Sequence, residues 1–163
     1  MADAPPFGRR DGEIAVGLPA HVDAGVYFIG RCRTPWRRRE DCPKNAGLSD
    51  AEGALEIDAP WAEGLAGLAA PAQIWALYWM DRAPRDLVVQ RPRHATHSRG
   101  VFALRSPARP NPLALSRLDL KRIEPLGAGA RLVVVGLDCL DGTPLIDVKP
   151  VSPGDAREPG VSP

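Results

Sequence analysis

Short runs of β-branched, aromatic and other apolar residues recur along this chain of 163 residues, and Pro and Gly separate them. Runs of this length and composition favour short strands. They do not alternate with helical patterns, as a parallel sheet with crossover helices requires. We therefore expect about seven short strands and a mostly β architecture. The runs are 26–30, 54–57, 74–80, 87–89, 100–104, 115–120 and 131–137.

One segment, Ala59–Leu68, has helical spacing. Pro60 fits the first turn of a helix, and apolar residues follow three and four positions apart. Its glycines limit the helix to a short or partly 3₁₀ one. Strands this short leave exposed edges unless the sheet closes on itself. The sequence thus predicts a mostly β, single-domain β-barrel of about seven short strands with one short helix over residues 20–151. A flexible N-terminal arm, 1–19, and a flexible tail, 152–163, are expected on either side.

The charge of the chain is balanced, with 21 Lys and Arg against 20 Asp and Glu and a formal net charge of +1. Whole-chain charge therefore does not indicate a nucleic-acid binder. The arginines, however, gather in two segments, which either follow a phosphate backbone or form solvated faces. They are Arg31, Arg33, Arg37, Arg38 and Arg39 in the first segment, and Arg82, Arg85, Arg91, Arg93, Arg99, Arg105 and Arg109 in the second.

Cysteine usage and hydropathy bound the compartment. The 3 cysteines form no C-x-x-C pair and no signal peptide is visible, which indicates a reducing compartment. The longest apolar run, 73–80, is about half as long as a membrane span. The sequence predicts a soluble, cytoplasmic protein without a membrane segment.

A stiff loop carries two arginines. Prolines at 107, 110 and 112 fix the backbone and exclude a helix interior or a central strand. Arg105 and Arg109 lie in this frame, where a guanidinium is suited to hold a carboxylate or a phosphate. The alternative interpretation is a solvated proline-rich turn.

A second polar loop follows the run that ends at Leu137. Asp141-Gly142 is typical of the turn of a β-hairpin, with a strand before it and another after it. Asp138, Asp147 and Lys149 flank the turn. These groups suit a ribose hydroxyl, an ammonium group or a proton, unless they are ordinary solvent-facing turn residues.

Other chemistries lack their motifs. His94 and His97 could pair with Cys32 and Cys42, but there is neither a zinc knuckle nor H-E-x-x-H, so no metal site is expected. The chain also lacks G-x-G-x-x-G after a strand and G-x-x-x-x-G-K-[ST]. Neither a Rossmann dinucleotide site nor a phosphate loop is predicted.

Taken together, Arg99–Pro112 and Leu140–Pro150 resemble the TsaA-like family, also called TrmO. The resemblance includes 29–36 and 42–48 and covers Val26 to Pro150. It implies an S-adenosylmethionine-dependent methyltransferase on a β-barrel rather than a Rossmann fold. The family's characterised reaction methylates the exocyclic nitrogen of threonylcarbamoyladenosine next to the tRNA anticodon. Its members form homodimers with the cofactor near the subunit interface, and longer bacterial members carry an additional C-terminal domain.

The resemblance also implies cofactor contacts in this chain. Lys44-Asn45 stand where the family has Arg-Gln, and Asp81-Arg82 stand where it has His-Gln. Ala114 and Val151 replace the family's usual Gly and Tyr. The implied cofactor contacts are Pro43, Lys44, Asn45, Asp81, Arg82, Arg105, Leu115, Asp138, Leu140, Asp141, Gly142 and Thr143.

A base is expected because the carbamoyl group makes the acceptor nitrogen a poor nucleophile, and Asp138 or Asp141 is the candidate. Positioning contributes most of the remaining catalysis. Arg109, Asn111 and Lys149 are expected to contact the substrate, tRNA. Three alternatives remain open. One is a methyltransferase of the same fold acting on another nucleic acid or a small molecule, one is a non-catalytic S-adenosylmethionine-binding module, and one is a plain structural barrel that binds no cofactor.

Overall fold

The computed structural model describes residues 9–44, 48–92 and 95–156. These residues form two compact units. We call Tyr27–Trp79 with Leu115–Pro163 the barrel unit, and Met1–Val26 with Met80–Ala114 the small unit. The predicted boundaries at 19/20 and 151/152 stay a prediction.

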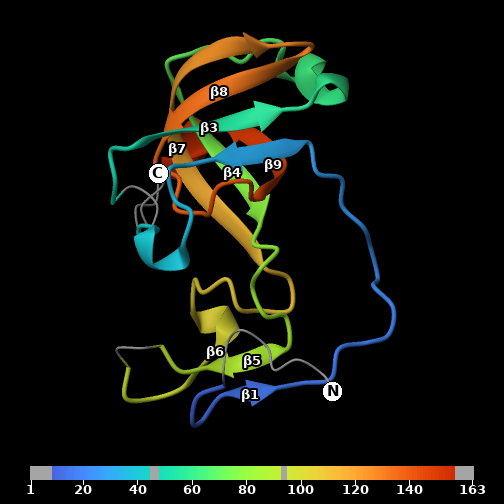
Figure 1. The fold of residues 1–163 in the computed structure, drawn as a ribbon, viewed down its shortest axis with the longest axis vertical. Coiled ribbons are helices and arrows are strands. Elements are labelled where there is room, and N and C mark those ends of the chain that lie inside the picture. The colour runs from blue at the N-terminus through green and yellow to red at the C-terminus, as the bar shows by residue number, and fades with distance from the viewer. Residues whose placement is uncertain (1–8, 45–47, 93–94, 157–163) are drawn as a thin grey trace. The chain divides into compact units, whose positions relative to one another are not determined.

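The barrel unit contains a closed sheet, labelled in Figure 1, whose strands follow the order β2-β3-β8-β7-β4-β9. Because the sheet closes on itself, it has no edge strand with unpaired backbone groups. Its strands are β2 (Gly30–Arg33), β3 (Glu52–Ile57), β4 (Ala72–Trp79), β7 (Leu113–Leu126), β8 (Gly129–Val135) and β9 (Pro144–Pro150).

Side chains alternate between the inside and the outside of the barrel, as the two-residue period of a strand requires. On β7, for example, Ser116, Leu118 and Leu120 are buried while the residues between them are exposed. The core is therefore assembled from alternate positions of every strand. Its largest fully buried side chains include Tyr78, Leu55, Ile74, Leu118, Leu120, Leu132 and Leu145.

Closure depends on a glycine. Gly30 on β2 pairs with Ile57 of β3 and with Leu145 of β9. A Cβ atom at position 30 would lie 1.8 Å from the Glu56 carbonyl oxygen, far inside any contact distance. Glycine is thus needed where the two neighbouring strands approach β2 most closely.

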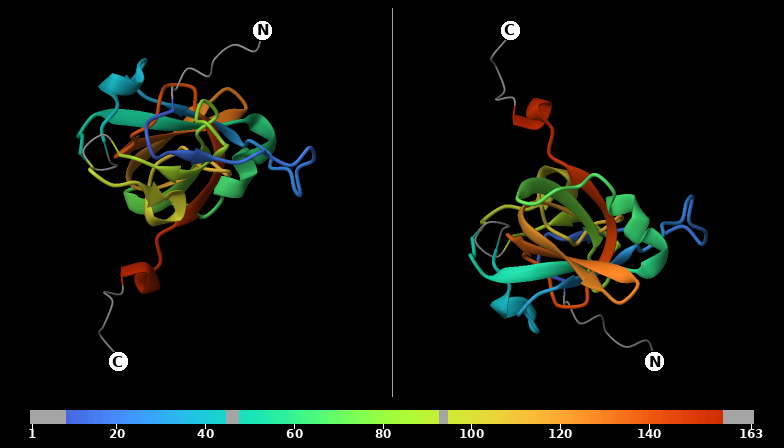
Figure 2. Two further views of the ribbon diagram at one scale, coloured as in Figure 1. Left: turned by 90° about the horizontal axis from the view of Figure 1, so that it is seen from below. Right: turned by 90° about the horizontal axis from the view of Figure 1, so that it is seen from above.

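The predicted short helix is the 3₁₀ helix η2 (Ala59–Leu65), which follows β3 and has Pro60 in its first turn. Figures 1 and 2 show it beside the turn that joins β7 and β8, where Gly129 lies close to the backbone of Ala59. Two further 3₁₀ turns belong to this unit: η1 (Arg39–Asp41) and η4 (Pro153–Ala156). No helix among the described residues is both long enough and apolar enough to cross a membrane.

The small unit contains a separate sheet in the order β1-β5-β6. Its strands are β1 (Ile14–Ala15), β5 (Leu87–Gln90) and β6 (Arg99–Gly100), and the 3₁₀ turn η3 (Val101–Ala103) follows directly. Leu87, Val101 and Ala108 form a small core, against which Ala15 packs. Part of the predicted N-terminal arm is therefore a paired strand, whereas residues 1–8 lie outside the described residues.

The mostly β barrel is confirmed, with differences in detail. The closed sheet has six strands rather than about seven: 87–90 and 99–100 pair in the other sheet, and β9, the strand expected after the Asp141-Gly142 turn, joins the barrel. The strand expected at 26–30 begins only at Gly30. The strand expected at 100–104 is wrong, since the Leu104 amide donates to the Val101 carbonyl and closes a turn there. Val101 is apolar because it is buried in a core, not because it lies in a strand.

Candidate functional site

The prediction that Asp141-Gly142 joins two strands of a hairpin is wrong. β8, before the turn, pairs with β3 and β7, whereas β9, after it, pairs with β2 and β4. We call residues 138–143 the Asp-Gly turn. It connects strands that are not neighbours, so it cannot be held by a hairpin ladder and needs other contacts.

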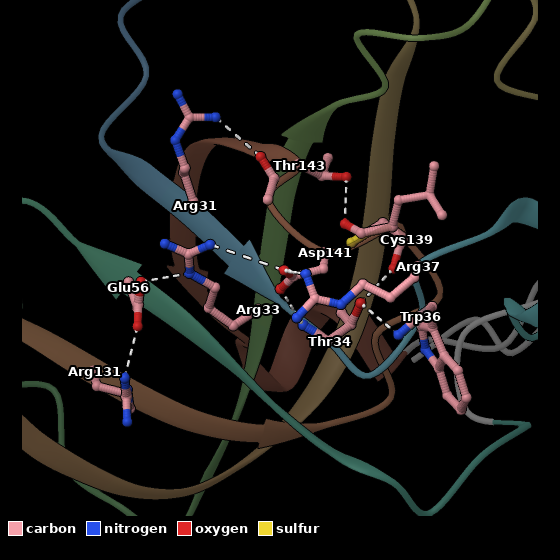
Figure 3. Close-up of polar contacts among 12 residues, drawn as sticks. Arg31, Arg33, Thr34, Trp36, Arg37, Glu56, Arg131, Cys139, Asp141 and Thr143 are labelled. Carbon is pink, nitrogen blue, oxygen red and sulfur yellow. Dashed lines mark hydrogen bonds and ion pairs between the residues drawn. The ribbon is translucent and has the colours of Figure 1, made fainter.

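Those contacts come from β2. The Cys32 amide donates to the Thr143 carbonyl, and the Gly142 amide donates to the Cys32 carbonyl, both at 2.8 Å. Arg31 adds a hydrogen bond from Nη1 to the Gly142 carbonyl at 3.0 Å (Figure 3). Gly142 has a φ of +81°, a conformation that side chains disfavour. The turn is therefore docked on the barrel in one conformation.

Asp141 fixes the turn through its side chain. Its Oδ1 accepts from the Thr34 amide at 3.2 Å, and its Oδ2 lies 2.9 Å from Nη1 of Arg37. Thr34 in turn donates its hydroxyl to the Cys139 carbonyl at 2.9 Å. Figure 3 shows these groups converging on the carboxylate from the end of β2. Both Asp141 oxygens are thus engaged within the protein.

Asp138 belongs to a second, buried network. The Tyr78 hydroxyl donates to Oδ1 of Asp138 at 2.5 Å and lies 2.7 Å from the Ser116 hydroxyl. Tyr78 is fully buried. Burial, followed by the charge of Asp138, raises the pKa of Tyr78 far above its ordinary value, so the phenol stays protonated and remains a donor. Tyr78 on β4 and Ser116 on β7 therefore orient the Asp138 carboxyl.

Tyr78 and Ser116 were predicted from the sequence only as strand residues. For Ser116 the signal in the sequence was a hydroxyl between more exposed positions of a strand, whereas Tyr78 lies in a continuously apolar run that shows no alternation. A buried hydroxyl needs a partner, but the partner is far away in the chain. Strand pairing, which the local sequence does not specify, brings them together.

The cysteines lie near this network as free thiols. A hydrogen bond to Cys139, together with burial, raises the pKa of Cys32. Burial, with the nearby charges of Cys139 and Asp138, raises the pKa of Cys42 to about 11. Cys32 and Cys42 are accordingly poor nucleophiles at neutral pH.

An open surface cavity of about 590 Å³ extends from Asp141 over β2, β3, β7 and β8. Glu56 holds Nε of Arg33 at 2.6 Å and Nη2 of Arg131 at 2.7 Å. Burial works to raise the pKa of Glu56, but the hydrogen bonds from these two arginines outweigh it and lower that pKa. The charged lining residues are Arg33, Arg37, Arg122, Arg131, Glu52, Glu56, Glu124 and Asp141.

This cavity carries equal numbers of positive and negative side chains, and several are paired. Arg33, Arg37 and Arg38 of the first arginine segment form ion pairs with Glu56, Asp141 and Asp41. Exposed pairs of this kind are solvated surface rather than a phosphate track. The structure therefore favours the solvated-face interpretation for that segment.

Other predicted contacts also lie in the barrel unit. Leu140 is half-buried, and Thr143 is buried with its hydroxyl donating to the Leu140 carbonyl at 2.7 Å. Leu115 is 47% exposed on β7, where the second chain segment of the barrel unit begins. Lys149 on β9 is exposed and lies 3.0 Å from Asp147. Lys44 is exposed, whereas Asn45 lies outside the described residues.

The remaining predicted residues lie in the small unit. Asp81 and Arg82 are exposed in a turn closed by the Ala83 amide and the Met80 carbonyl. Arg105 and Asn111 are exposed in the loop that carries prolines 107, 110 and 112, which we call the proline-rich loop. The turn residues and Pro43 thus belong to one unit, and the loop residues belong to the other. A joint site of both sets stays a prediction.

Arg109 has a structural contact that was not predicted from the sequence. Its Nη2 donates to the carbonyls of Val101 and Leu104 and so braces η3. Prolines have no backbone N–H, so the proline-rich loop offers few amide donors to nearby carbonyls. That shortage was the signal in the sequence that a side-chain donor would be needed here. Its predicted contact with the substrate has to be compatible with this bracing role.

Known proteins share the sequence pattern that forms both loops. A model of the tRNA-methyltransferase O N-terminal domain matches residues 31–155, which include the Asp-Gly turn and the proline-rich loop. The chain belongs to the TrmO family. It is 43% identical over 141 residues to the probable S-adenosyl-L-methionine-binding protein VirR of Rhizobium radiobacter, covering 86% of this chain and 78% of that protein.

Members that are named as enzymes are also similar. The tRNA (adenine(37)-N6)-methyltransferase of Escherichia coli is 35% identical over 132 residues, covering 77% of this chain and 56% of that protein. The crystal structure of TrmO from Pseudomonas aeruginosa matches 86% of this chain with a TM-score of 0.65 and 32% identity. This chain spans 61% of that solved chain.

Proposed function

We propose that this chain is an S-adenosylmethionine-dependent methyltransferase that methylates N6 of an adenine in tRNA. The observation that carries the proposal is the TrmO family match across 31–155, because it includes both loops at which cofactor contacts are expected. The finer proposal is that the adenine is threonylcarbamoyladenosine next to the anticodon. We further propose a cytoplasmic homodimer with the cofactor near the subunit interface.

The residues present fit this cofactor. A cationic sulfonium and an ammonium group need carboxylates nearby, and the half-buried Asp138 supplies one. The adenine ring needs apolar contacts, which the half-buried Leu140 and the exposed Leu115 can provide. The methionine carboxylate needs a guanidinium, and Arg105 is the proposed partner. When bound, S-adenosylmethionine supplies a methyl group on a positively charged sulfur.

Asp138 is the better candidate for the base. Both oxygens of Asp141 are engaged by Thr34 and Arg37, so Asp141 would have to leave the turn to take a proton. In the described part of the chain, the hydrogen bond to Asp138 is made to Oδ1 only. Tyr78 thereby orients the carboxyl group and leaves Oδ2 to accept the proton that the acceptor nitrogen loses on methylation.

The test is transfer of a labelled methyl group to tRNA. We expect incorporation into tRNA that carries threonylcarbamoyladenosine and none into tRNA made without that modification. Asp138→Asn should abolish transfer while keeping cofactor binding measurable by calorimetry. Incorporation that does not depend on the modification would move the activity to another site in tRNA, and sedimentation of the purified chain checks the homodimer.

A second candidate is a protein that binds S-adenosylmethionine without transferring its methyl group. Its support is the name of the 43% identical relative, a probable S-adenosyl-L-methionine-binding protein. Tight cofactor binding with no transfer to tRNA, modified or unmodified, would favour this candidate. Arg105→Ala should weaken cofactor binding under either function, and an unchanged affinity would remove Arg105 from the site.

A further inference from the structure

The small unit presents an aromatic ring to solvent. Phe102 is the middle residue of η3 and is 87% exposed, whereas its neighbour Val101 is fully buried in the core of the unit. Burial of Val101 fixes η3 against Leu87 and Ala108, so the following side chain points outward. The ring is therefore open to a partner, and because single exposed apolar residues are common, its role depends on how it is held and on the charges beside it.

The ring sits on a braced turn. The Leu104 amide donates to the Val101 carbonyl at 3.2 Å, and Arg109 donates to the carbonyls of both Val101 and Leu104. These contacts fix the backbone on either side of Phe102 before any partner arrives. A preorganised aromatic group loses little entropy on binding, which favours stacking over loose hydrophobic contact.

The chain on either side of the ring is basic. Arg99 and Arg105, three residues before and after Phe102, are both exposed. Between Asp86 and Asp119 the sequence has no acidic residue at all. In that interval it has Arg91, Arg93, Arg99, Arg105, Arg109 and Arg117. Exposed arginines on both sides of an aromatic ring fit a polyanion that carries bases, rather than an apolar protein surface.

We propose that Phe102 is a stacking platform for an unpaired base of the RNA substrate, with Arg99 contacting the adjoining phosphate. The proposal deepens the proposed function and rests on it for the identity of the RNA. Single-stranded RNA loops are recognised through bases that stack on aromatic side chains, and guanidinium groups hold their phosphates. Arg105 is left for the cofactor, so the platform is distinct from the cofactor contacts.

The experiment measures RNA binding by the full chain without methyl transfer. The probe is an RNA anticodon stem-loop with 2-aminopurine in the loop, whose fluorescence falls when the base stacks on a ring. Phe102→Leu removes the aromatic ring but keeps an apolar side chain, and Phe102→Trp keeps a ring. We expect Phe102→Leu to weaken binding by about tenfold and lose the fluorescence change, and Phe102→Trp to retain both.

Arg99→Ala should weaken binding and make it less dependent on salt, whereas Arg122→Ala, on the barrel unit, should not. Unfolding in urea and calorimetry with S-adenosylmethionine check that the Phe102 variants fold and bind cofactor as the parent does. Because Phe102 is exposed, neither measurement should change.

Two results would overturn the platform: unchanged affinity and fluorescence in Phe102→Leu, or no binding of the stem-loop by the parent chain. A change of oligomeric state in Phe102→Leu, with RNA binding intact, would assign the ring to a contact between protein copies and overturn it as well. Stem-loop binding that depends on the ring, in a chain that transfers no methyl group, would uphold the platform and overturn the proposed enzyme.

Discussion

At the scale of single residues, the Tyr78 hydroxyl links two strands of the barrel and the segment that follows a third. It joins β4 to Ser116 on β7 and to Asp138 after β8. Removing it by Tyr78→Phe leaves a buried hydroxyl and a half-buried carboxyl without this partner. We expect unfolding in urea to show a loss of about 1–3 kcal/mol. Tyr27→Phe is the control, because Tyr27 is 79% exposed and should lose nothing.

A double-mutant cycle of Tyr78→Phe with Asp138→Asn isolates this contact from other effects of each change. The two residues share a hydrogen bond, so their effects on the free energy of unfolding should not add. Strict additivity, or a Tyr78→Phe variant as stable as the parent, would show that the network does not stabilise the barrel.

Glu56 makes the stability of the fold depend on pH. Its pKa is lowered in the folded chain by Arg33 and Arg131, against the opposing effect of burial. The folded state therefore binds this proton less readily than the unfolded state, and the stability it contributes is present above the unfolded pKa of about 4.3. That contribution is lost as the pH falls through the folded pKa.

We therefore expect Glu56→Gln to be less stable than the parent at pH 7, with the difference shrinking as the pH is lowered below about 4. Urea unfolding at several pH values measures it. Glu63→Gln, on the exposed η2, is the matched control. A difference that is constant, or that grows toward acid pH, would contradict the role assigned to the two arginines.

At the scale of elements, the sequence indicated most strands of the barrel, because their alternation reflects burial on one face. It misplaced 100–104, where a buried valine in a 3₁₀ turn resembles a strand, and it joined β8 to β9 in a hairpin. Asp-Gly favours a tight turn, and the turn is there. Which strands then pair depends on closure of the barrel, where β2 takes the place beside β9 that the hairpin would need.

Two glycines allow the Asp-Gly turn to be tested as an element. Gly142 and Gly127 have positive φ angles, +81° and +58°, and a Cβ atom at either position would meet no other atom within 4 Å. Substitution by Ala should therefore cost only backbone strain, about 1–2 kcal/mol at either site. Gly127 lies in the turn between β7 and β8 and is not among the predicted cofactor contacts.

Both variants should lose similar stability in urea, but only Gly142→Ala should weaken S-adenosylmethionine binding in calorimetry. Cofactor affinity unchanged from the parent in both variants would remove the Asp-Gly turn from the cofactor site. Equal weakening in both would mean that the effect follows from stability alone and not from the shape of the turn.

At the scale of the whole molecule, the sequence suggested one domain because no linker separates the two units. The small unit is built from two stretches of chain, with β1 pairing to β5 far along the sequence. A discontinuous unit leaves no change in composition at a single boundary, so reading along the chain does not detect it. The candidate site inherits this division, since its predicted residues fall in both units.

The division leads to a prediction about cofactor binding that hydrogen exchange measures. If Arg105 and Asp138 contact one molecule of S-adenosylmethionine, its binding must slow amide exchange in both units, around 81–82 and 104–106 as well as around 138–143. A ligand that binds only the folded state also stabilises it, by about 2.7 kcal/mol at one hundred times its dissociation constant. Global stabilisation therefore has to be separated from local contact.

S-adenosylhomocysteine serves as a non-reactive probe for this separation, compared between the parent and Arg105→Ala at equal fractional saturation. Local contact predicts that Arg105→Ala loses protection mainly in the small unit and keeps it at the Asp-Gly turn. Protection confined to the barrel unit in the parent would place the cofactor there alone. The guanidinium of the proline-rich loop would then be left to the RNA rather than to the methyl donor.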